Sequence, residues 1–290
     1  CTLYAMIEHI KDDSINIISL ENPVEYEIEG VKQVAVNDKT GLTFARGLRS
    51  VLRQDPDVIM VGEMRDRETV EIALQASLTG HLVLSTLHTN TTVGAVTRLR
   101  NMGVPSYLIA SSLNGVVAQR LARRICRDCK APYVPDADEL ARLGLKEAMA
   151  PGLEFYRGRG CSRCGDTGYR GRIGVFEILT CGAAMRREIT ADAHEESLAR
   201  TAIGSGMRYM SQDGLDKVLK GETTIEEILR VLNVERETGM LLCCDCGGHL
   251  RPGFLVCPYC GASIVNGCPC CGAPREPEWK FCPYCVGKTA

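Results

Sequence analysis

Short apolar runs alternate with amphipathic segments along the first half of the chain. Three runs have the length and composition of buried strands, at residues 15–20, 58–61 and 82–87. The segments around them repeat apolar side chains at helical spacing, and they predict helices near residues 2–11, 43–52 and 67–79. Strands that alternate with helices predict a parallel sheet with crossover connections, and hence an α/β fold.

Local signals refine this pattern. Residues 24–36 alternate between apolar and polar side chains and predict a hairpin that turns near Gly30. Thr43 predicts a helix cap, and its helix must end before Pro56, because the residue preceding a proline avoids the helical region. Further along we expect two helices, at residues 92–102 and 105–122. A strand at 173–179 and then a helical region up to about Val234 should follow.

The spacing of the cysteines divides the rest of the chain. Sixteen cysteines occur in the 290 residues, and twelve of them form six CxxC pairs. In an intracellular protein such pairs favour metal ligation over disulfides. We expect four parts: an α/β core, a four-cysteine insertion, a strand with a helical subdomain, and a cysteine-rich tail, over residues 1–123, 124–172, 173–236 and 240–290.

The composition narrows the class of protein. Hydrophobic residues make up 45% of the chain and aromatic residues only 5%, which suits an aliphatic parallel sheet. The net charge of −2 provides no bulk attraction for nucleic acid. No apolar run in the sequence approaches the roughly 20 residues that a membrane-spanning helix needs.

Two polar side chains follow the second and third apolar runs. The run over 58–61 ends in Gly62 and Glu63, and the run over 82–87 ends in His88. Ligands of open parallel sheets bind just beyond the carboxyl ends of the strands. We therefore expect Glu63 and His88 to converge on one nucleotide pocket. There Glu63 would hold Mg²⁺ through water or orient the attacking water, and His88 would contact the γ-phosphate.

Each of these residues also has a plain structural interpretation. Glu63 alone could be a solvated acid at a strand end, and His88 alone could be a polar loop residue. The polar neighbours of His88 favour a functional role, and these are Thr86, Thr89 and Asn90.

A second pair of acids follows the first apolar run. Glu21 and Glu25 flank Asn22-Pro23. Two carboxylates at a strand end could position Mg²⁺ or the attacking water. Taken alone, they are better explained as acids of an exposed hairpin.

The first two CxxC pairs have the ligand spacing of a four-thiolate zinc site. They are Cys126 with Cys129 and Cys161 with Cys164, and 31 residues separate them. Four protein ligands leave no open coordination position, so we expect this zinc to be structural. Free thiols are the alternative.

The cysteine-rich tail contains an internal repeat. A CxxC-x₁₀-CxxC unit recurs 25 residues later, and the second pair of each unit reads CPYC. A segment this short, with few large apolar side chains, cannot build its own core. Metal binding would therefore supply the folding free energy, on the order of 10 kcal/mol per site. We expect two zinc ribbons that dock on protein, with ligands Cys243, Cys246, Cys257, Cys260, Cys268, Cys271, Cys282 and Cys285.

No phosphate-binding loop of the form GxxxxGK[ST] occurs in the 290 residues. Such a loop opens a helix, because a helix N-terminus offers free N–H groups and a favourable dipole to anions. The predicted helix at 2–11 suits that place. We therefore expect the sequence to begin just after the loop, with Thr2 near the phosphates; a genuine start without a loop is the alternative.

Three segments together resemble the secretion ATPase superfamily, specifically the type II secretion and type IV pilus assembly ATPases. IISLENPVEYEIEGVKQ is similar to its Asp box, RQDPDVIMVGEMRD to its atypical Walker B motif with Glu63 as the acid, and GHLVLSTLHTN to its His box. The resemblance runs from about Thr2 to Arg230. One departure is Asn22, where the family often has Asp.

The resemblance implies a RecA-like P-loop NTPase core that uses ATP and Mg²⁺ beside Zn²⁺. It implies catalytic roles for Glu63, Glu25, Glu21 and His88. Within the motifs we assign nucleotide contacts to Thr2, Asp57, Gly62, Arg65 and Thr86. The first four-cysteine group matches the metal-binding insertion of the extension and secretion branch, which retraction ATPases lack.

Members of this superfamily form homo-hexameric cytoplasmic motors, peripheral at the inner membrane. Their ATP hydrolysis acts on an inner-membrane platform protein that builds a pilus or pseudopilus. The resemblance therefore implies an ATPase of this kind, although we expect these 290 residues to be inactive alone.

Two other functions stay open. A non-catalytic scaffold would present the zinc ribbons from a degenerate ATPase core, but the retention of Glu63 and His88 disfavours it. A nucleic-acid-dependent ATPase would need a basic surface that this nearly neutral chain lacks, so no nucleic acid partner is expected.

Overall fold

The computed structural model describes residues 2–142, 153–232, 241–242, 249–250, 256–257 and 259–262. The chain divides into two compact units. Unit 1 comprises Cys1–Val116 and Thr180–Leu198, and unit 2 comprises Val117–Leu179 and Ala199–Ala290. The expected division into four parts stays a prediction.

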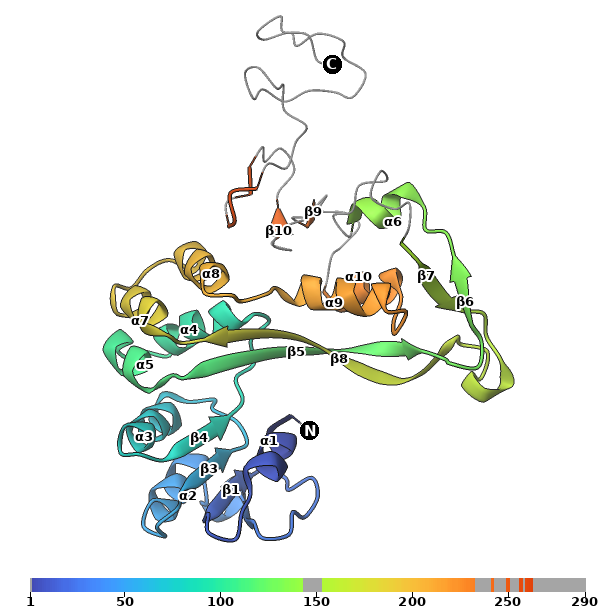
Figure 1. Cartoon of the computed structure of the whole chain (residues 1–290). Helices are drawn as coiled ribbons and strands as arrows, with labels where there is room; N and C mark the ends of the chain where they lie inside the picture. Colours follow the sequence, from blue (N-terminus) through green and yellow to red (C-terminus); the bar gives the residue numbers. More distant parts are fainter. Residues whose placement is uncertain are drawn as a thin grey trace, which may run out of the picture. The chain divides into compact units, whose positions relative to one another are not determined.

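A parallel sheet forms the centre of unit 1 (Figure 1). Among the described residues it has four strands in the order β2-β1-β3-β4. Every neighbouring pair is parallel, and Val61 lies opposite both Leu20 and Ser85. The expected α/β fold with a parallel sheet is confirmed. The strand bounds are β1 (Ile17–Glu21), β2 (Lys32–Ala35), β3 (Val58–Val61) and β4 (Leu82–Ser85).

Both faces of this sheet are covered by helices. Successive residues of a strand point to opposite faces, so Val58 and Met60 of β3 pack with the first helix, whereas Ile59 and Val61 pack with the next two. All four side chains are buried, which explains why β3 reads as an uninterrupted apolar run. The three helices are α1 (Thr2–Ile10), α2 (Phe44–Val51) and α3 (Arg67–Leu78).

Two arginines tie the later helices of unit 1 together. Arg100 donates to the carbonyl oxygens of Ile189 and Ala193 at 2.8 and 2.7 Å, at the end of α7. Arg186 of α7 donates to the carbonyl oxygens of Ala110 and Ser111 at 2.6 and 3.0 Å, near the end of α5. Each side chain thus satisfies terminal carbonyls of another helix. The helices concerned are α4 (Thr92–Asn101), α5 (Ser106–Ser112) and α7 (Ala183–Thr190).

The hairpin expected over residues 24–36 is wrong. Only Lys32–Ala35 form a strand, and this strand pairs parallel with β1. Ile28 is buried in the core between the exposed Glu27 and Glu29. A loop that inserts one side chain into the core therefore produced the alternation that suggests a hairpin. The 3-10 turn Asp38–Thr40 follows.

The helix expected over residues 105–122 is half wrong. α5 ends at Ser112, and residues 115–125 form a long strand instead. Its buried residues Ala118 and Ala122 are four positions apart, a spacing that fits one face of a strand as well as one face of a helix. Periodicity alone could not separate the two.

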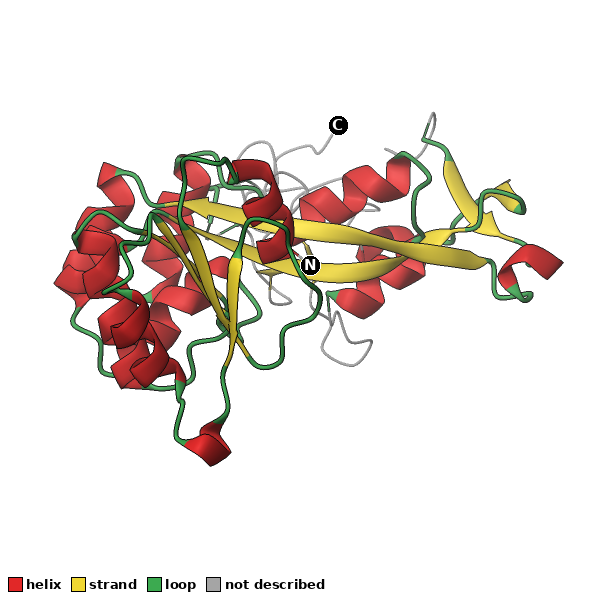
Figure 2. Ribbon diagram, turned by 90° about the horizontal axis from the view of Figure 1, so that it is seen from below, coloured by secondary structure: helices red, strands yellow, loops and turns green. Residues whose placement is uncertain are grey.

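A long two-stranded ribbon runs into unit 2 (Figures 1 and 2). It consists of β5 (Gly115–Ile125) and β8 (Tyr169–Thr180), which point in opposite directions. Ala118, Ala122 and Val175 of the ribbon pack with buried side chains of α9 and α10 to form the core of unit 2. The remaining elements are α6 (Ala137–Arg142), β6 (Lys130–Tyr133), β7 (Phe155–Gly158), η3 (Ser162–Cys164), α8 (Glu195–Gly204), α9 (Met210–Leu219), α10 (Ile225–Val231), β9 (Leu241–Leu242) and β10 (His249–Leu250).

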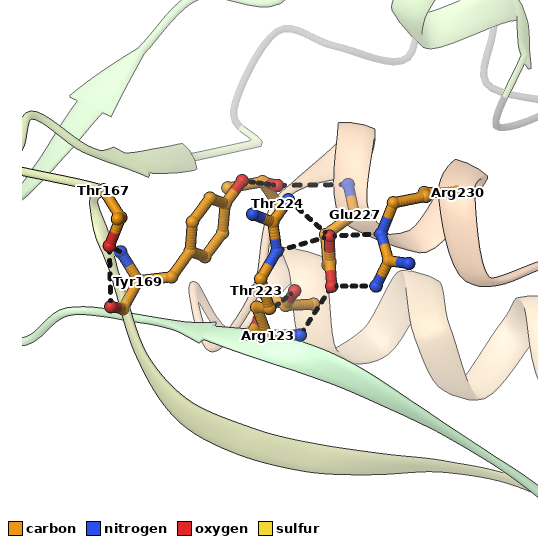
Figure 3. A network of polar contacts seen from close by, with 7 residues as sticks. All are labelled: Arg123, Thr167, Tyr169, Thr223, Thr224, Glu227 and Arg230. Atoms are coloured by element: carbon orange, nitrogen blue, oxygen red, sulfur yellow. Dashed lines mark hydrogen bonds and ion pairs between the residues drawn. The ribbon is translucent and has the colours of Figure 1, made fainter.

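A buried carboxylate joins the ribbon to α10 (Figure 3). Glu227 has no exposed side-chain surface, and the guanidinium groups of Arg123 and Arg230 donate to it at 2.6–2.9 Å. The backbone N–H of Arg123 also donates to its Oε1 at 2.7 Å. The Arg123 guanidinium lies 4.2 Å from the ring centre of Tyr169. Burial opposes ionisation, but the bonds from Arg230 and Arg123 outweigh it and lower the pKa of Glu227 to about 2.

We expect Glu227→Gln to lower the free energy of unfolding at pH 7 by about 3 kcal/mol, because it takes the charged partner from two arginines. An unfolded Glu titrates near pH 4.5, so the ionised Glu227 stabilises the fold above that pH. This contribution is lost as the pH falls from 4.5 towards 2. The loss of unfolding free energy caused by Glu227→Gln should therefore be smaller at pH 3 than at pH 7. Urea unfolding at pH 7 and pH 3 measures both effects.

Glu226→Gln is the matched control, because Glu226 is the exposed neighbour on the same helix. It should change the free energy of unfolding by less than about 0.5 kcal/mol. A penalty for Glu227→Gln of the same size at both pH values would contradict the assignment.

Candidate functional site

The ends of β3 and β4 place Glu63 and His88 at one edge of the sheet. β3 and β4 run in the same direction and in register, so both deliver the next residues to the carboxyl edge. The pairing continues one step further, because the Met64 N–H donates to the Thr86 carbonyl oxygen at 3.1 Å. Two loops that are far apart in sequence therefore start side by side.

Glu63 and His88 are in contact. His88 Nε2 lies 3.4 Å from Glu63 Oε2, and Arg65 Nε donates to the same oxygen at 2.5 Å. The Glu63 side chain is 14% exposed, whereas those of His88 and Arg65 are 80% and 72% exposed. The expected convergence of Glu63 and His88 is thus present. A mostly covered carboxylate is held by two side chains that also face solvent, an arrangement suited to binding an anion beside an acid.

Gly62 and Thr86 have structural contacts that the sequence did not suggest. A Cβ on Gly62 would lie 3.2 Å from the Leu20 carbonyl oxygen, so a side chain would crowd the end of β1. The Thr86 hydroxyl donates to the Gly62 carbonyl oxygen at 2.7 Å. Both residues fasten neighbouring strand ends. Gly62 was assigned a nucleotide contact from the sequence, and its close neighbour in the structure is the backbone of β1.

Glu21 is buried at the end of β1, with 3% exposure. Its Oε1 accepts hydrogen bonds from the Ser19 hydroxyl at 2.6 Å and from Gln33 Nε2 at 3.0 Å. Its Oε2 accepts from the hydroxyl of Tyr4 on α1. Burial, and then this hydrogen bond, raise the pKa of Tyr4. Glu21 therefore joins α1, β1 and β2 through both of its oxygens.

Tyr4, Ser19 and Gln33 were not identified from the sequence. Tyr4 lies on the predicted helix, and the other two lie within the segment that resembles the Asp box. A tyrosine on the core-facing side of a helix was the available signal, since a buried Tyr hydroxyl usually has a polar partner.

Three further candidates lie on other segments than Glu63. Glu25 is exposed, and its backbone N–H donates to the Tyr4 hydroxyl at 3.1 Å. Thr2 is the first residue of α1. Asp57 precedes β3, where its carboxylate accepts from the Asn16 N–H at 2.7 Å. That is the amino edge of the sheet, so this geometry does not support the expected nucleotide contact of Asp57.

The four cysteines of the insertion form one cluster. Their Sγ atoms all lie within 4.8 Å of one another. Three of the separations are 3.9 Å for Cys126 to Cys161, 3.9 Å for Cys129 to Cys164, and 3.7 Å for Cys161 to Cys164. Thiolates about 2.3 Å from a tetrahedral zinc would be separated by about 3.8 Å. The donor set and its spacing therefore fit this metal.

The backbone holds the two pairs of cysteines together. The Cys126 N–H donates to the Gly168 carbonyl oxygen at 2.9 Å, and the Arg159 N–H donates to the Cys129 carbonyl oxygen at 3.0 Å. Gly158 and Gly168 approach so closely that a Cβ on Gly158 would lie 2.0 Å from the Gly168 oxygen. The long excursion between the pairs thus returns through a glycine contact that no larger residue could make.

The thiols differ in acidity. Burial raises the pKa of Cys126, and it raises that of Cys129 to about 12. For Cys164, burial acts in the same direction, but the hydrogen bonds from the Cys161 and Gly168 backbone outweigh it and lower the pKa to about 6.

The tail is described only in part. Cys257 and Cys260 lie within the described residues, on one turn whose Gly261 N–H donates to the Cys257 carbonyl oxygen at 3.0 Å. The other expected ligands of the tail lie outside the described residues, namely Cys243, Cys246, Cys268, Cys271, Cys282 and Cys285.

Two known families match this chain, one over residues 1–230 and the other over residues 243–286. The family described as "Type II/IV secretion system protein" matches residues 1–230. The chain belongs to this family. A second family, "Double zinc ribbon", matches residues 243–286, so the tail is a double zinc ribbon domain.

Curated relatives carry names from two systems. The chain is 53% identical over 234 residues to "Type II secretion system protein E" of Pseudomonas aeruginosa, covering 81% of the chain and 46% of the relative. It is 49% identical over 228 residues to "Type IV pilus assembly ATPase PilB" of Thermus thermophilus, covering 79% of the chain and 26% of the relative. The chain thus spans less than half the length of these secretion ATPases.

Solved structures have the same fold. The structure of the pilus retraction motor PilT with bound ADP matches with a TM-score of 0.57 and 30% identity, covering 79% of this chain and 56% of PilT. The Legionella pneumophila ATPase DotB, at 21% identity, matches with a TM-score of 0.56 and supports the fold alone. The expected RecA-like ATPase fold is confirmed. No helix in the described part of the chain combines the length and apolar character of a membrane span.

We expect Tyr4→Phe to lower the free energy of unfolding by about 1–3 kcal/mol, because it takes a hydrogen bond from the buried Glu21. Tyr26→Phe is the matched control. Tyr26 is 52% exposed, and its ring lies 4.4 Å from that of Tyr4. Urea unfolding measures both variants, and equal penalties would contradict the role of the Tyr4 hydroxyl.

Proposed function

We propose that this chain forms the water-activating and zinc-binding part of an ATP-hydrolysing motor for type II secretion or type IV pilus assembly. The contact between Glu63 and His88, at the carboxyl ends of adjacent parallel strands, carries this proposal. It combines an acid for water activation with a basic side chain for phosphate. The names of the relatives support these two systems for the proposed motor.

In the proposed mechanism Glu63 orients the attacking water. Arg65 and His88 both contact Oε2, and they thereby orient the carboxylate. Bound ATP would supply the phosphoryl group, and Mg²⁺ would neutralise part of the phosphate charge. His88 and Arg65 are exposed enough to reach a terminal phosphate once it lies at this edge.

The other members of the site act through position. Glu21 holds α1 against the sheet through Tyr4, so Thr2 at the start of α1 keeps a fixed place relative to the strand ends. A helix start of this kind favours phosphate. Glu25 is exposed on the loop that follows β1 and is available to bind a hydrated Mg²⁺.

Zinc has a structural role in the proposal. Cys126, Cys129, Cys161 and Cys164 hold one ion, and each ribbon of the tail holds another. In the insertion, the metal replaces the apolar core that short β6 and β7 cannot build by themselves.

The proposed assembly is a homo-hexamer on the cytoplasmic side of the inner membrane, peripheral to it. Its partner there is the platform protein of a pilus or secretion system. We propose no nucleic acid partner.

We expect Glu63→Gln to lower kcat at least about 100-fold while nucleotide binding is retained, because the amide cannot act as a base. The sequence contains no GxxxxGK[ST] loop. The assay therefore uses a chimera in which the part of the Pseudomonas aeruginosa secretion protein E that precedes its matched region is joined to Thr2. Phosphate release measures turnover, and a fluorescent ATP analogue measures binding.

Glu68→Gln is the control, because Glu68 lies nearby on α3 with a 59% exposed side chain. It should keep wild-type turnover. A chimera that binds nucleotide without hydrolysing it would favour the non-catalytic scaffold. Turnover unchanged by Glu63→Gln would remove Glu63 from the mechanism.

We expect three zinc ions per chain by elemental analysis, and two after Cys164→Ser, because the cluster loses one of four ligands. Cys181→Ser should keep all three. Cys181 is buried, burial raises its pKa to about 11, and it is not a member of the cluster. Fewer than two ions in the unmodified chain would show that a ribbon assignment is wrong.

A further inference from the structure

The described part of the first zinc ribbon, the CxxC-x₁₀-CxxC unit from Cys243 to Cys260, lies against the helical region of unit 2. Cys257, one of its expected zinc ligands, is only 1% exposed. It packs with Ile203 and Tyr209, which come from the end of α8 and the start of α9. Tyr259 and Ala262 of the ribbon complete the cluster. An expected metal ligand is thus covered by side chains from outside the zinc ribbon.

The ribbon turn has the closed form that a pair of zinc ligands requires. The Gly261 N–H donates to the Cys257 carbonyl oxygen at 3.0 Å, and the Cys257 N–H donates to the Ala262 carbonyl oxygen at 2.7 Å. Gly261 adopts a φ of +76°, which favours glycine. The turn therefore holds Cys257 and Cys260 on one loop, with Cys260 exposed and Cys257 covered.

Tyr209 supplies the main contact from the helical region. Its ring centre lies 5.9 Å from that of Tyr259, with an edge-to-face angle of 72°. Tyr209 occupies the N-cap position of α9, but its side chain makes no capping hydrogen bond. The next residue, Met210, is buried in the core of unit 2. The burial of Met210 therefore fixes the backbone that carries Tyr209.

We propose that the connection between α8 and α9 is the docking site of the first zinc ribbon, and that Ile203 and Tyr209 cover its expected zinc ligand Cys257. The inference rests on the proposed zinc occupancy of the ribbon. An apolar shell around a metal site limits the access of solvent. Docking therefore retains the metal, and by linkage the metal stabilises docking, because an intact turn is needed to present Tyr259.

The test measures zinc release from the full chain to a coloured chelator. Three variants are compared with the unmodified protein: Tyr209→Ala, Ile203→Ala and Tyr209→Phe. Both alanine variants should start with the same zinc content and lose one ion about tenfold faster or more, as is typical when groups around a metal site are removed. Tyr209→Phe keeps the ring and should behave as the unmodified chain does.

Tyr107→Ala is the matched control, because Tyr107 is a 66% exposed tyrosine on α5 of unit 1. It should leave all release rates unchanged. A double-mutant cycle with Tyr259→Ala should be non-additive, since both substitutions remove the same ring contact. Unchanged release in both alanine variants, or full additivity with Tyr259→Ala, would overturn the docking site.

Hydrogen exchange separates this proposal from the proposed function. Amides over residues 256–262 should lose protection in Tyr209→Ala and keep it in Tyr107→Ala, whether or not the chimera hydrolyses ATP. If the chain holds zinc only in the four-cysteine cluster, the metal part of the inference is wrong, and the exchange result then decides docking alone. Unchanged protection in Tyr209→Ala would exclude docking as well.

Discussion

The parallel pairing of β1, β3 and β4 is the constraint on which the site depends. β3 is buried on both faces, so a shift of one residue would exchange the side chains that face α1 with those that face α2 and α3. The register in turn determines where Glu63 emerges, two residues beyond Val61. His88, which follows β4, reaches the Glu63 carboxylate only because β3 and β4 end at the same edge of the sheet.

Buried acids in the two units differ from Glu63 in how their oxygens are used. Glu21 and Glu227 use both oxygens on donors from the protein, and each joins elements that are distant in sequence. Two arginines compensate the charge of Glu227, whereas Glu21 accepts from the neutral side chains of Tyr4, Ser19 and Gln33. In both cases removing a partner costs stability. Glu63 has both of its contacts on Oε2 and keeps part of its surface exposed. An acid with an open side can still orient water, and for this reason we propose the catalytic role for Glu63.

The sequence predicted what local patterns determine. The contact between Glu63 and His88 could be expected because both residues come at the end of an apolar run, and the cysteine cluster because metal ligands need close spacing. The tie between Tyr4 and Glu21 depends on a tertiary contact between residues 17 positions apart, and no local period reports it. The strand after Ser112 was mistaken for a helix because Ala118 and Ala122 satisfy both periods. Asp57 was assigned because it lies in the same motif as Glu63, although β3 separates the two residues and they lie at opposite edges of the sheet.

The two groups of cysteines in the described part of the chain have different surroundings. The cluster from Cys126 to Cys164 is shaped by its own backbone, where Gly158 and Gly168 meet and the two pairs exchange hydrogen bonds with the crossing strands. The turn that carries Cys257 instead borrows its apolar cover from Ile203 and Tyr209. A metal site that makes its own shell can hold its ion independently of its surroundings. In our proposal, the site of the first zinc ribbon takes its cover from the helical region, so its hold on zinc depends on docking, and that dependence distinguishes it from a freely tethered tail.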